Sequence, residues 1–95
     1  MTLTAPPFPG HPASMRVKVR LFASLREAAG RSEVVLELRG GATAEDAWGR
    51  LAADFPALLP RRLSLALSVN RRYAAFDTVL QEGDEVVFVP PVSGG

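Results

Sequence analysis

Alternation of apolar and polar side chains is the first pattern in this chain, and it predicts a β-strand. In residues 15–22 the apolar side chains of Val17, Val19 and Leu21 fall on one face. The charged residues between them fall on the other face, together with Phe22. Successive side chains of a strand point to opposite faces of a sheet, so this segment is typical of a half-buried strand.

Three further segments indicate strands. Residues 33–38 alternate as the first segment does, and residues 65–69 and 85–89 are short apolar runs bounded by turn residues. If Val86 and Phe88 of the last segment face the covering helix, alternation places Val87 and Val89 on the opposite face of the sheet.

A helix is expected between Thr43 and Pro56, where apolar residues recur at spacings of three and four. Thr43 is the expected N-cap with Asp46 as its reciprocal partner, and Pro56 cannot continue a helix. Trp48 lies on the apolar stripe and is expected to anchor the core. The stripe consists of Ala44, Ala47, Trp48, Leu51, Ala52 and Phe55.

A shorter helix is expected after the first strand. Residues 24–27 fit a capping box, and Gly30 stands where this helix would end in the left-handed conformation. Turns are expected at residues 40–41, 70–72 and 81–84. One long helix packed across one face of a mixed sheet is a β-grasp (ubiquitin-like) arrangement, an α+β fold that leaves the other sheet face open.

The length of 95 residues allows one domain. Residues 1–14 are rich in proline and show no periodicity, so a disordered leader is expected there. Residues 15–89 are expected to form the β-grasp domain, and residues 90–95 a C-terminal tail.

Composition excludes several classes of function. The chain has a net charge of +1 with its basic residues spread along the sequence, which is unlike a nucleic-acid footprint. It contains no cysteine and one histidine, His11 in the leader, so we expect neither an iron–sulfur cluster nor a metal site. No apolar run approaches the length of a membrane span, and the N-terminus does not resemble a signal peptide, so a cytoplasmic location is expected.

The last six residues have the composition of a tail that enters a partner's active site. Glycine has no side chain, so Gly94 and Gly95 can pass through a narrow channel, while the two prolines stiffen the base of the tail. Six extended residues reach roughly 20 Å. This pattern predicts a carrier protein that presents the carboxylate of Gly95. The residues of the tail are Pro90, Pro91, Val92, Ser93, Gly94 and Gly95.

With these elements in place, the chain resembles the MoaD family, the small sulfur-carrier subunits of molybdopterin synthase. The resemblance lies in residues 21–27, in Ser68-Val69-Asn70, and above all in the closing string of residues 83–95. It covers residues 15–95 and leaves only the leader outside.

The resemblance implies that an adenylating enzyme uses ATP to activate the carboxylate of Gly95, with Gly94 beside it. A sulfur donor then displaces AMP and leaves a thiocarboxylate. The large subunit of molybdopterin synthase receives this carrier, in a heterotetramer with two of each subunit, and sulfur passes to cyclic pyranopterin monophosphate. The chain itself would bind no cofactor, and the catalytic groups would come from its partners, because nothing in the sequence resembles a general base or an oxyanion hole.

Docking on these partners requires an exposed apolar patch, which we expect on the open sheet face. The resemblance implies that Phe22, Tyr73 and Val89 make the apolar contacts with the large subunit and with the activating enzyme. The alternative is that Phe22 and Tyr73 complete the core. The full set of expected partner-binding residues is Phe22, Tyr73, Val89, Pro90, Pro91, Val92 and Ser93.

Other functions remain open. A sulfur carrier for thiamine synthesis or tRNA thiolation, or a ubiquitin-like modifier conjugated through Gly95, would share the activation step and differ in the acceptor. A β-grasp binding module would have a Gly-Gly end without function. A β-grasp ferredoxin is excluded by the missing cysteines, and an RNA-binding module is disfavoured by the near-neutral charge.

Overall fold

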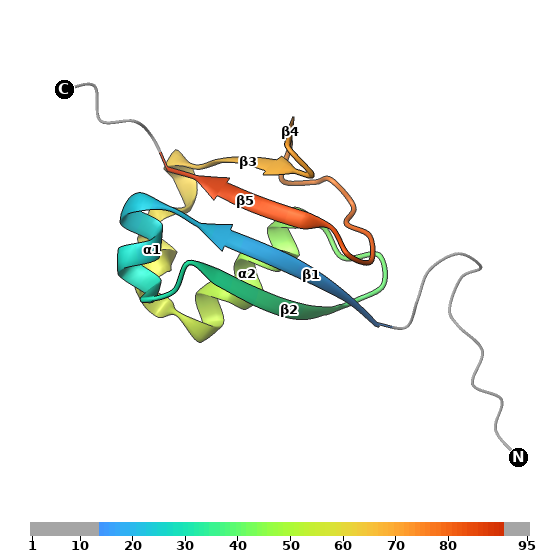
Figure 1. Ribbon diagram of the computed structural model, residues 1–95, viewed down its shortest axis with the longest axis horizontal. Helices are drawn as coiled ribbons and strands as arrows, with labels where there is room; N and C mark the ends of the chain where they lie inside the picture. Colours follow the sequence, from blue (N-terminus) through green and yellow to red (C-terminus); the bar gives the residue numbers. More distant parts are fainter. Residues whose placement is uncertain (1–13, 91–95) are drawn as a thin grey trace, which may run out of the picture.

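A mixed five-stranded sheet with helices on one face forms the fold (Figure 1). The computed structural model describes residues 14–90, so most of the predicted leader and tail lie outside the described residues. The strand order is β2-β1-β5-β3-β4; β1 and β5 are parallel and every other neighbouring pair is antiparallel. The elements are β1 Ser14–Leu21, α1 Ala23–Ala29, β2 Glu33–Arg39, α2 Ala44–Asp54, the 3₁₀ helix η1 Pro56–Ser64, β3 Ala66–Val69, β4 Arg72–Ala74 and β5 Glu85–Val89.

The predicted β-grasp fold is confirmed, and the core lies between the sheet and its helical layer. Side chains alternate between buried and exposed along the whole of β1, as the sequence predicts. On β5, Val86 and Phe88 point into the core. The indole of Trp48 packs edge-on against the ring of Phe88 with 5.0 Å between the ring centroids. Trp48 is therefore the core anchor that the helical stripe predicts.

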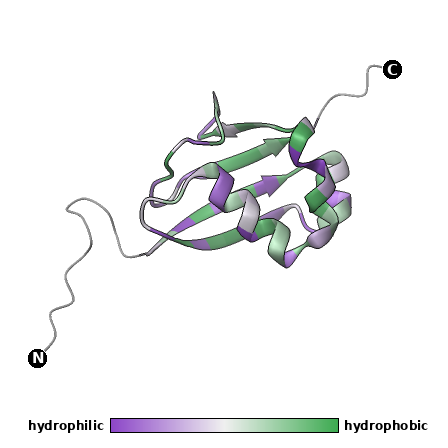
Figure 2. Ribbon diagram, turned by 180° about the vertical axis from the view of Figure 1, so that it is seen from behind, coloured by the Kyte–Doolittle hydropathy of each residue, from purple (hydrophilic) through white to green (hydrophobic). Residues whose placement is uncertain are grey.

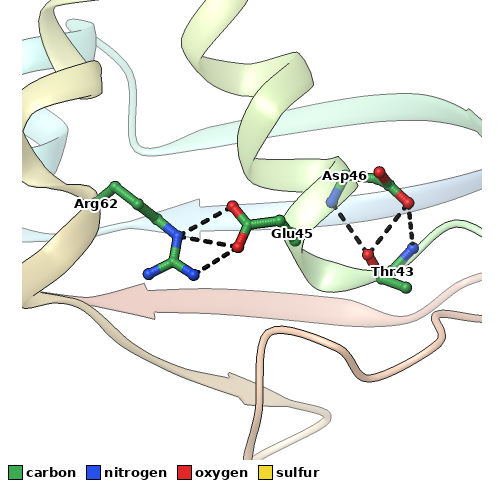
Figure 3. A network of polar contacts seen from close by, with 4 residues as sticks. All are labelled: Thr43, Glu45, Asp46 and Arg62. Atoms are coloured by element: carbon green, nitrogen blue, oxygen red, sulfur yellow. Dashed lines mark hydrogen bonds and ion pairs between the residues drawn. The ribbon is translucent and has the colours of Figure 1, made fainter.

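The capping of α2 also agrees with the sequence. The hydroxyl of Thr43 accepts a hydrogen bond from the backbone N–H of Asp46 at 3.3 Å. The Asp46 carboxylate in turn accepts from the backbone N–H of Thr43 at 2.9 Å (Figure 3). The backbone hydrogen bond from Thr43 is the main reason that the pKa of Asp46 lies below its usual value. This reciprocal pair satisfies two backbone donors that a helix N-terminus leaves free.

The start of α1 differs from the prediction. We expected residues 24–27 to form a capping box, but the helix begins at Ala23 and Phe22 occupies the N-cap without a side-chain hydrogen bond. The backbone N–H groups of Leu25 and Arg26 donate to the carbonyl of Phe22 at 3.1 and 3.3 Å. The backbone therefore turns directly from strand to helix. The helix ends as predicted, with Gly30 in the left-handed region at φ +74°.

The 3₁₀ helix η1 is an element that the sequence prediction omitted, and it adds to the helical layer of α1 and α2. It follows α2 directly, with Pro56 in its first turn and Leu58 buried. Arg62 fixes it to the rest of the domain. The guanidinium of Arg62 makes a bidentate ion pair with Glu45 of α2, with 3.0 Å between Nε and Oε2 (Figure 3). The same group lies 3.4 Å from the ring centroid of Phe76.

The ion pair shifts the pKa of both partners. The hydrogen bonds from Arg62 lower the pKa of Glu45 below its usual value, and the same contact raises the pKa of Arg62. Both shifts favour the charged forms and thus the closed pair at neutral pH.

Candidate docking face at the base of the C-terminal segment

The face of the sheet that carries no helix presents a cluster of apolar side chains near the point where the chain leaves β5. Strand pairing defines this cluster, because residues opposite each other in neighbouring strands point to the same face. Ser68 pairs with Val87 on one side and with Tyr73 on the other, and Val89 pairs with Ala66. Phe22 directly follows the Leu21–Phe88 pair, which places it beside Val89. We call Phe22, Ala66, Tyr73, Val87 and Val89 the open-face patch.

The backbone of the strand-to-helix connection positions Phe22. Its carbonyl accepts the two hydrogen bonds that start α1, and the next residue, Ala23, has φ +51°. The side chain of Phe22 is 47% exposed, and the guanidinium of Arg20 lies 5.9 Å from its ring centroid. Arg20 is exposed on the open face, two residues earlier in β1. Phe22 is therefore an aromatic side chain held at the sheet surface, and it lies outside the core.

Tyr73 lies on the edge strand β4 and is 84% exposed. The two-residue turn of Asn70 and Arg71, both with positive φ, brings β4 back against β3. The alternative that Phe22 and Tyr73 complete the core does not fit these exposures. Two aromatic residues presented to solvent on the same face are typical of a protein-binding surface.

Hydrogen bonds of Asn70 connect two of the motifs that carry the family resemblance. The side-chain amide of Asn70 donates to the carboxylate of Asp84 at 2.8 Å, and its carbonyl oxygen accepts from the backbone N–H of Glu85 at 2.9 Å. The backbone N–H of Asn70 donates to the Glu85 carbonyl at 2.8 Å. Asn70, expected only as a turn former, thus joins the β3–β4 hairpin to the start of β5. Sequence reasoning missed this contact, although both motifs were recognised.

Ion pairs border the open-face patch on the side of β1 and β2. Arg20 lies 3.5 Å from Glu85, and Lys18 lies 3.8 Å from Glu33. These pairs are exposed and contribute little to stability. They leave the patch itself without a charged side chain of its own, which suits an apolar contact with a charged rim.

The remaining predicted site residues lie at the C-terminal end of this face. Val89 and Pro90 are half-buried and stand at the edge of the described chain. The others, namely Pro91, Val92, Ser93, Gly94 and Gly95, lie outside the described residues. The structure therefore brings Phe22, Tyr73 and Val89 onto one face, next to the point from which the tail continues.

The described residues contain neither a group of three potential metal-ligating side chains nor a helix long and apolar enough to cross a membrane. None of the buried side chains among residues 14–90 is polar or charged.

Comparison with known proteins gives a consistent result. The model of the ThiS family matches residues 19–95. A molybdopterin synthase sulfur carrier subunit from Arabidopsis thaliana is 34% identical and aligns over 87% of this chain and 86% of its own length. A protein of the same description from Chlamydomonas reinhardtii is 39% identical, over 85% of this chain and 100% of its own. Among solved structures, that of the small archaeal modifier protein SAMP1 from Haloferax volcanii has a TM-score of 0.76 and 34% identity, covering 84% of this chain and 99% of the other.

Proposed function

The chain belongs to the ThiS family, and from this premise we propose that it is a sulfur carrier protein of molybdenum cofactor biosynthesis. The observation that supports this proposal most directly is that the family model matches the chain through to Gly95. The open-face patch, which lies close to Pro90, is the surface on which a partner could dock. The relatives from Arabidopsis thaliana and Chlamydomonas reinhardtii carry the description of a sulfur carrier subunit, which favours the molybdopterin branch of the family.

The proposed chemistry takes place on the C-terminal carboxylate. A carboxylate is a poor electrophile, so the activating enzyme adenylates Gly95 with ATP and gives the acyl carbon a good leaving group. A sulfur donor displaces AMP, and the chain then carries a thiocarboxylate. Sulfur bound to an acyl group is a good nucleophile, and this explains how a carrier can work without cysteine.

The proposed acceptor is cyclic pyranopterin monophosphate, bound to the large subunit of molybdopterin synthase. The dithiolene product needs two sulfur atoms, so two carriers would serve a heterotetramer with two of each subunit. In this proposal the open-face patch docks on the large subunit and on the activating enzyme in turn. Phe22 and Tyr73 supply the aromatic anchors, while Val89 and Pro90 direct the tail into the partner. We propose the cytoplasm as the site of this reaction.

A second function is favoured by the similarity to SAMP1 of Haloferax volcanii. In this alternative, the activated Gly95 forms an isopeptide bond with a lysine of a target protein. Both functions use the same activation and the same docking face, so they differ only in the group that attacks the acyl carbon. A carrier for thiamine or tRNA thiolation would differ in the same way.

Intact-mass spectrometry tests the proposal. The chain is incubated with the activating enzyme of its own genome, ATP and a sulfide source, beside a variant that lacks Gly95. We expect a mass gain equal to the replacement of one oxygen by sulfur, in the full chain alone. The chain that carries the thiocarboxylate is then mixed with the large synthase subunit and the pterin precursor. Loss of the sulfur with formation of molybdopterin supports the carrier, whereas adducts on lysines support the modifier. The same mass gain in the variant that lacks Gly95 would contradict both functions.

A further inference from the structure

A cleft opens beside Pro90, on the helical side of the sheet. Its volume is about 250 Å³, and it lies between the start of α1, the second half of η1 and the end of β5. Its lining consists of Ser24, Pro60, Arg61, Ser64, Leu65 and Pro90. Pro90 directly follows Val89 of the open-face patch, so the tail leaves the domain between two surfaces. One is the apolar patch, and the other is this cleft.

Among the described residues, no acidic side chain pairs with the arginine that lines the cleft. Helix η1 contains two arginines and no acidic residue. Arg62 is held by Glu45, but Arg61 makes no ion pair or side-chain hydrogen bond with any of residues 14–90. The cleft thus combines a guanidinium with the hydroxyls of Ser24 and Ser64 between walls formed by proline and leucine side chains. A guanidinium and two hydroxyls can all donate hydrogen bonds to a carboxylate.

The surface around the cleft is apolar as well. Leu63 of η1 is 95% exposed, and Leu59 of the same helix is also largely exposed. Neither side chain belongs to the core of residues 14–90. A free anion would gain nothing from these leucines, whereas a protein segment with an acidic residue beside an apolar one could contact both. The adjacent open-face patch gives such a protein a second point of attachment.

We propose that this cleft is a second docking point, which takes an aspartate or glutamate side chain of the protein that receives the tail. The inference rests on the proposed function, since a receiving partner is its premise. The acidic side chain pairs with Arg61 and accepts hydrogen bonds from the two serines. Contacts on both sides of Pro90 then fix the direction in which the tail enters the partner. Arg61 is a positioning residue in this arrangement, because it does not touch the reacting carboxylate.

The test measures binding of the full chain to the activating enzyme and to the large synthase subunit from its own genome. The variants are Arg61→Glu, Arg61→Ala and Arg61→Lys. Arg39→Glu is the control, because it makes the same change of charge at an exposed position. Arg39 pairs with Ser14, the first residue of β1, and lies far from Pro90. We expect Arg61→Glu to weaken binding of at least one partner by about 10-fold or more, because it places like charges together. Arg61→Lys should retain more affinity than Arg61→Ala, and Arg39→Glu should bind as the natural chain does.

Salt dependence separates a charge contact from a change of shape. Raising the ionic strength from about 0.1 M to about 1 M shortens the screening length from about 10 Å to about 3 Å, so the natural chain should lose more affinity than Arg61→Ala does. Equal binding by Arg61→Glu and Arg39→Glu would overturn the second docking point and leave the proposed function intact. Failure of the natural chain to bind either partner would overturn the proposed function and this inference with it.

Nuclear magnetic resonance of the free chain identifies other occupants. If removal of residues 91–95 shifts the Arg61 Nε–H signal, the chain's own tail occupies the cleft and the assignment to a partner is wrong. If inorganic phosphate alone shifts this signal while Arg61→Glu leaves partner binding unchanged, the cleft is an anion site. A signal that moves only when the partner is added supports the proposal.

Discussion

The contact of Arg62 with Glu45 and Phe76 allows a quantitative prediction, because one partly exposed side chain joins η1 to two other segments of the domain. The guanidinium forms a bidentate ion pair with Glu45 (Figure 3). It also lies over the Phe76 ring. Both ion-pair partners are partly exposed, at 31% for the Arg62 side chain and 51% for that of Glu45. We expect Arg62→Ala to lower the free energy of unfolding while the fold is kept.

The magnitude follows from the exposure of the two contacts. An ion pair on the surface contributes about 0.2–1 kcal/mol after screening by solvent. A cation–π contact at an exposed site adds about 0.5–1 kcal/mol. The expected loss is therefore about 1–2 kcal/mol. For a domain of this size, each kcal/mol corresponds to a fall in Tm of about 4–8 °C.

The pH dependence separates the two contacts. Because Arg62 lowers the pKa of Glu45, the ion pair stabilises the fold above the unfolded-state pKa of Glu45, and this stabilisation is lost as the pH falls through the lower folded-state pKa. The difference in stability between the natural chain and Arg62→Ala should therefore shrink below pH 4.5, the ordinary pKa of this carboxyl. The cation–π share should persist, since it does not depend on Glu45.

Urea denaturation followed by Trp48 fluorescence measures both effects, since Trp48 is buried in the folded domain. Arg61→Ala is the matched control, because it makes the same substitution at the neighbouring position of η1 without breaking an ion pair. The reasoning is refuted if Arg62→Ala is no less stable than this control at neutral pH. A difference that stays constant down to pH 3 would show that the ion pair adds nothing and the ring contact everything.

Three other substitutions, and one control, have defined outcomes. Trp48→Ala should cost about 3–5 kcal/mol in urea denaturation, a large share of the stability of a small domain, because it empties the contact with Phe88. Arg71→Gly should raise stability by about 1 kcal/mol, since Arg71 has φ +71° in a two-residue turn that favours Asn-Gly; an unchanged melting temperature would contradict this. Phe22→Arg should weaken partner binding by about 2 kcal/mol and leave the circular dichroism spectrum unchanged, whereas Val35→Arg, on the same sheet face outside the patch, should affect neither.

Those elements whose own residues determine them could be predicted from the sequence. Helix α2 has a complete apolar stripe, a Thr43–Asp46 cap and a terminating proline, and all three act within one segment. On β5 the unbroken apolar run left the inward face open, and alternation predicted only that Val87 and Val89 lie on the face opposite to Val86 and Phe88, as they do. Local chemistry and the final structure agree at these positions, which is why short-range patterns were sufficient.

The elements that the prediction missed depend on contacts between distant segments. Helix η1 has Pro60 inside it, and Leu58 is its single buried side chain. The contacts that hold it come from Glu45 and Phe76, which are 17 and 14 positions away in the chain from Arg62. At the start of α1, the strand and the carbonyl of Phe22 set the first turn, so a favourable Ser24 was not used as the cap. Neither outcome can be read from a window of neighbouring residues.

The same long-range contacts link stability to the candidate site. The hydrogen bonds of Asn70 fix the hairpin that carries Tyr73 to the start of β5. The contact of Arg62 with Glu45 fixes η1, which carries Arg61 beside the end of β5. The first contact lies at the start of β5 and the second beside its end, so supports stand at both ends of this strand (Figures 1 and 2). A carrier must bind and release two partners in turn, so its docking contacts should each be weak and exposed while the supports beneath them are firm. The distribution observed here, with exposed Phe22, Tyr73 and Arg61 above hydrogen-bonded supports, meets that requirement.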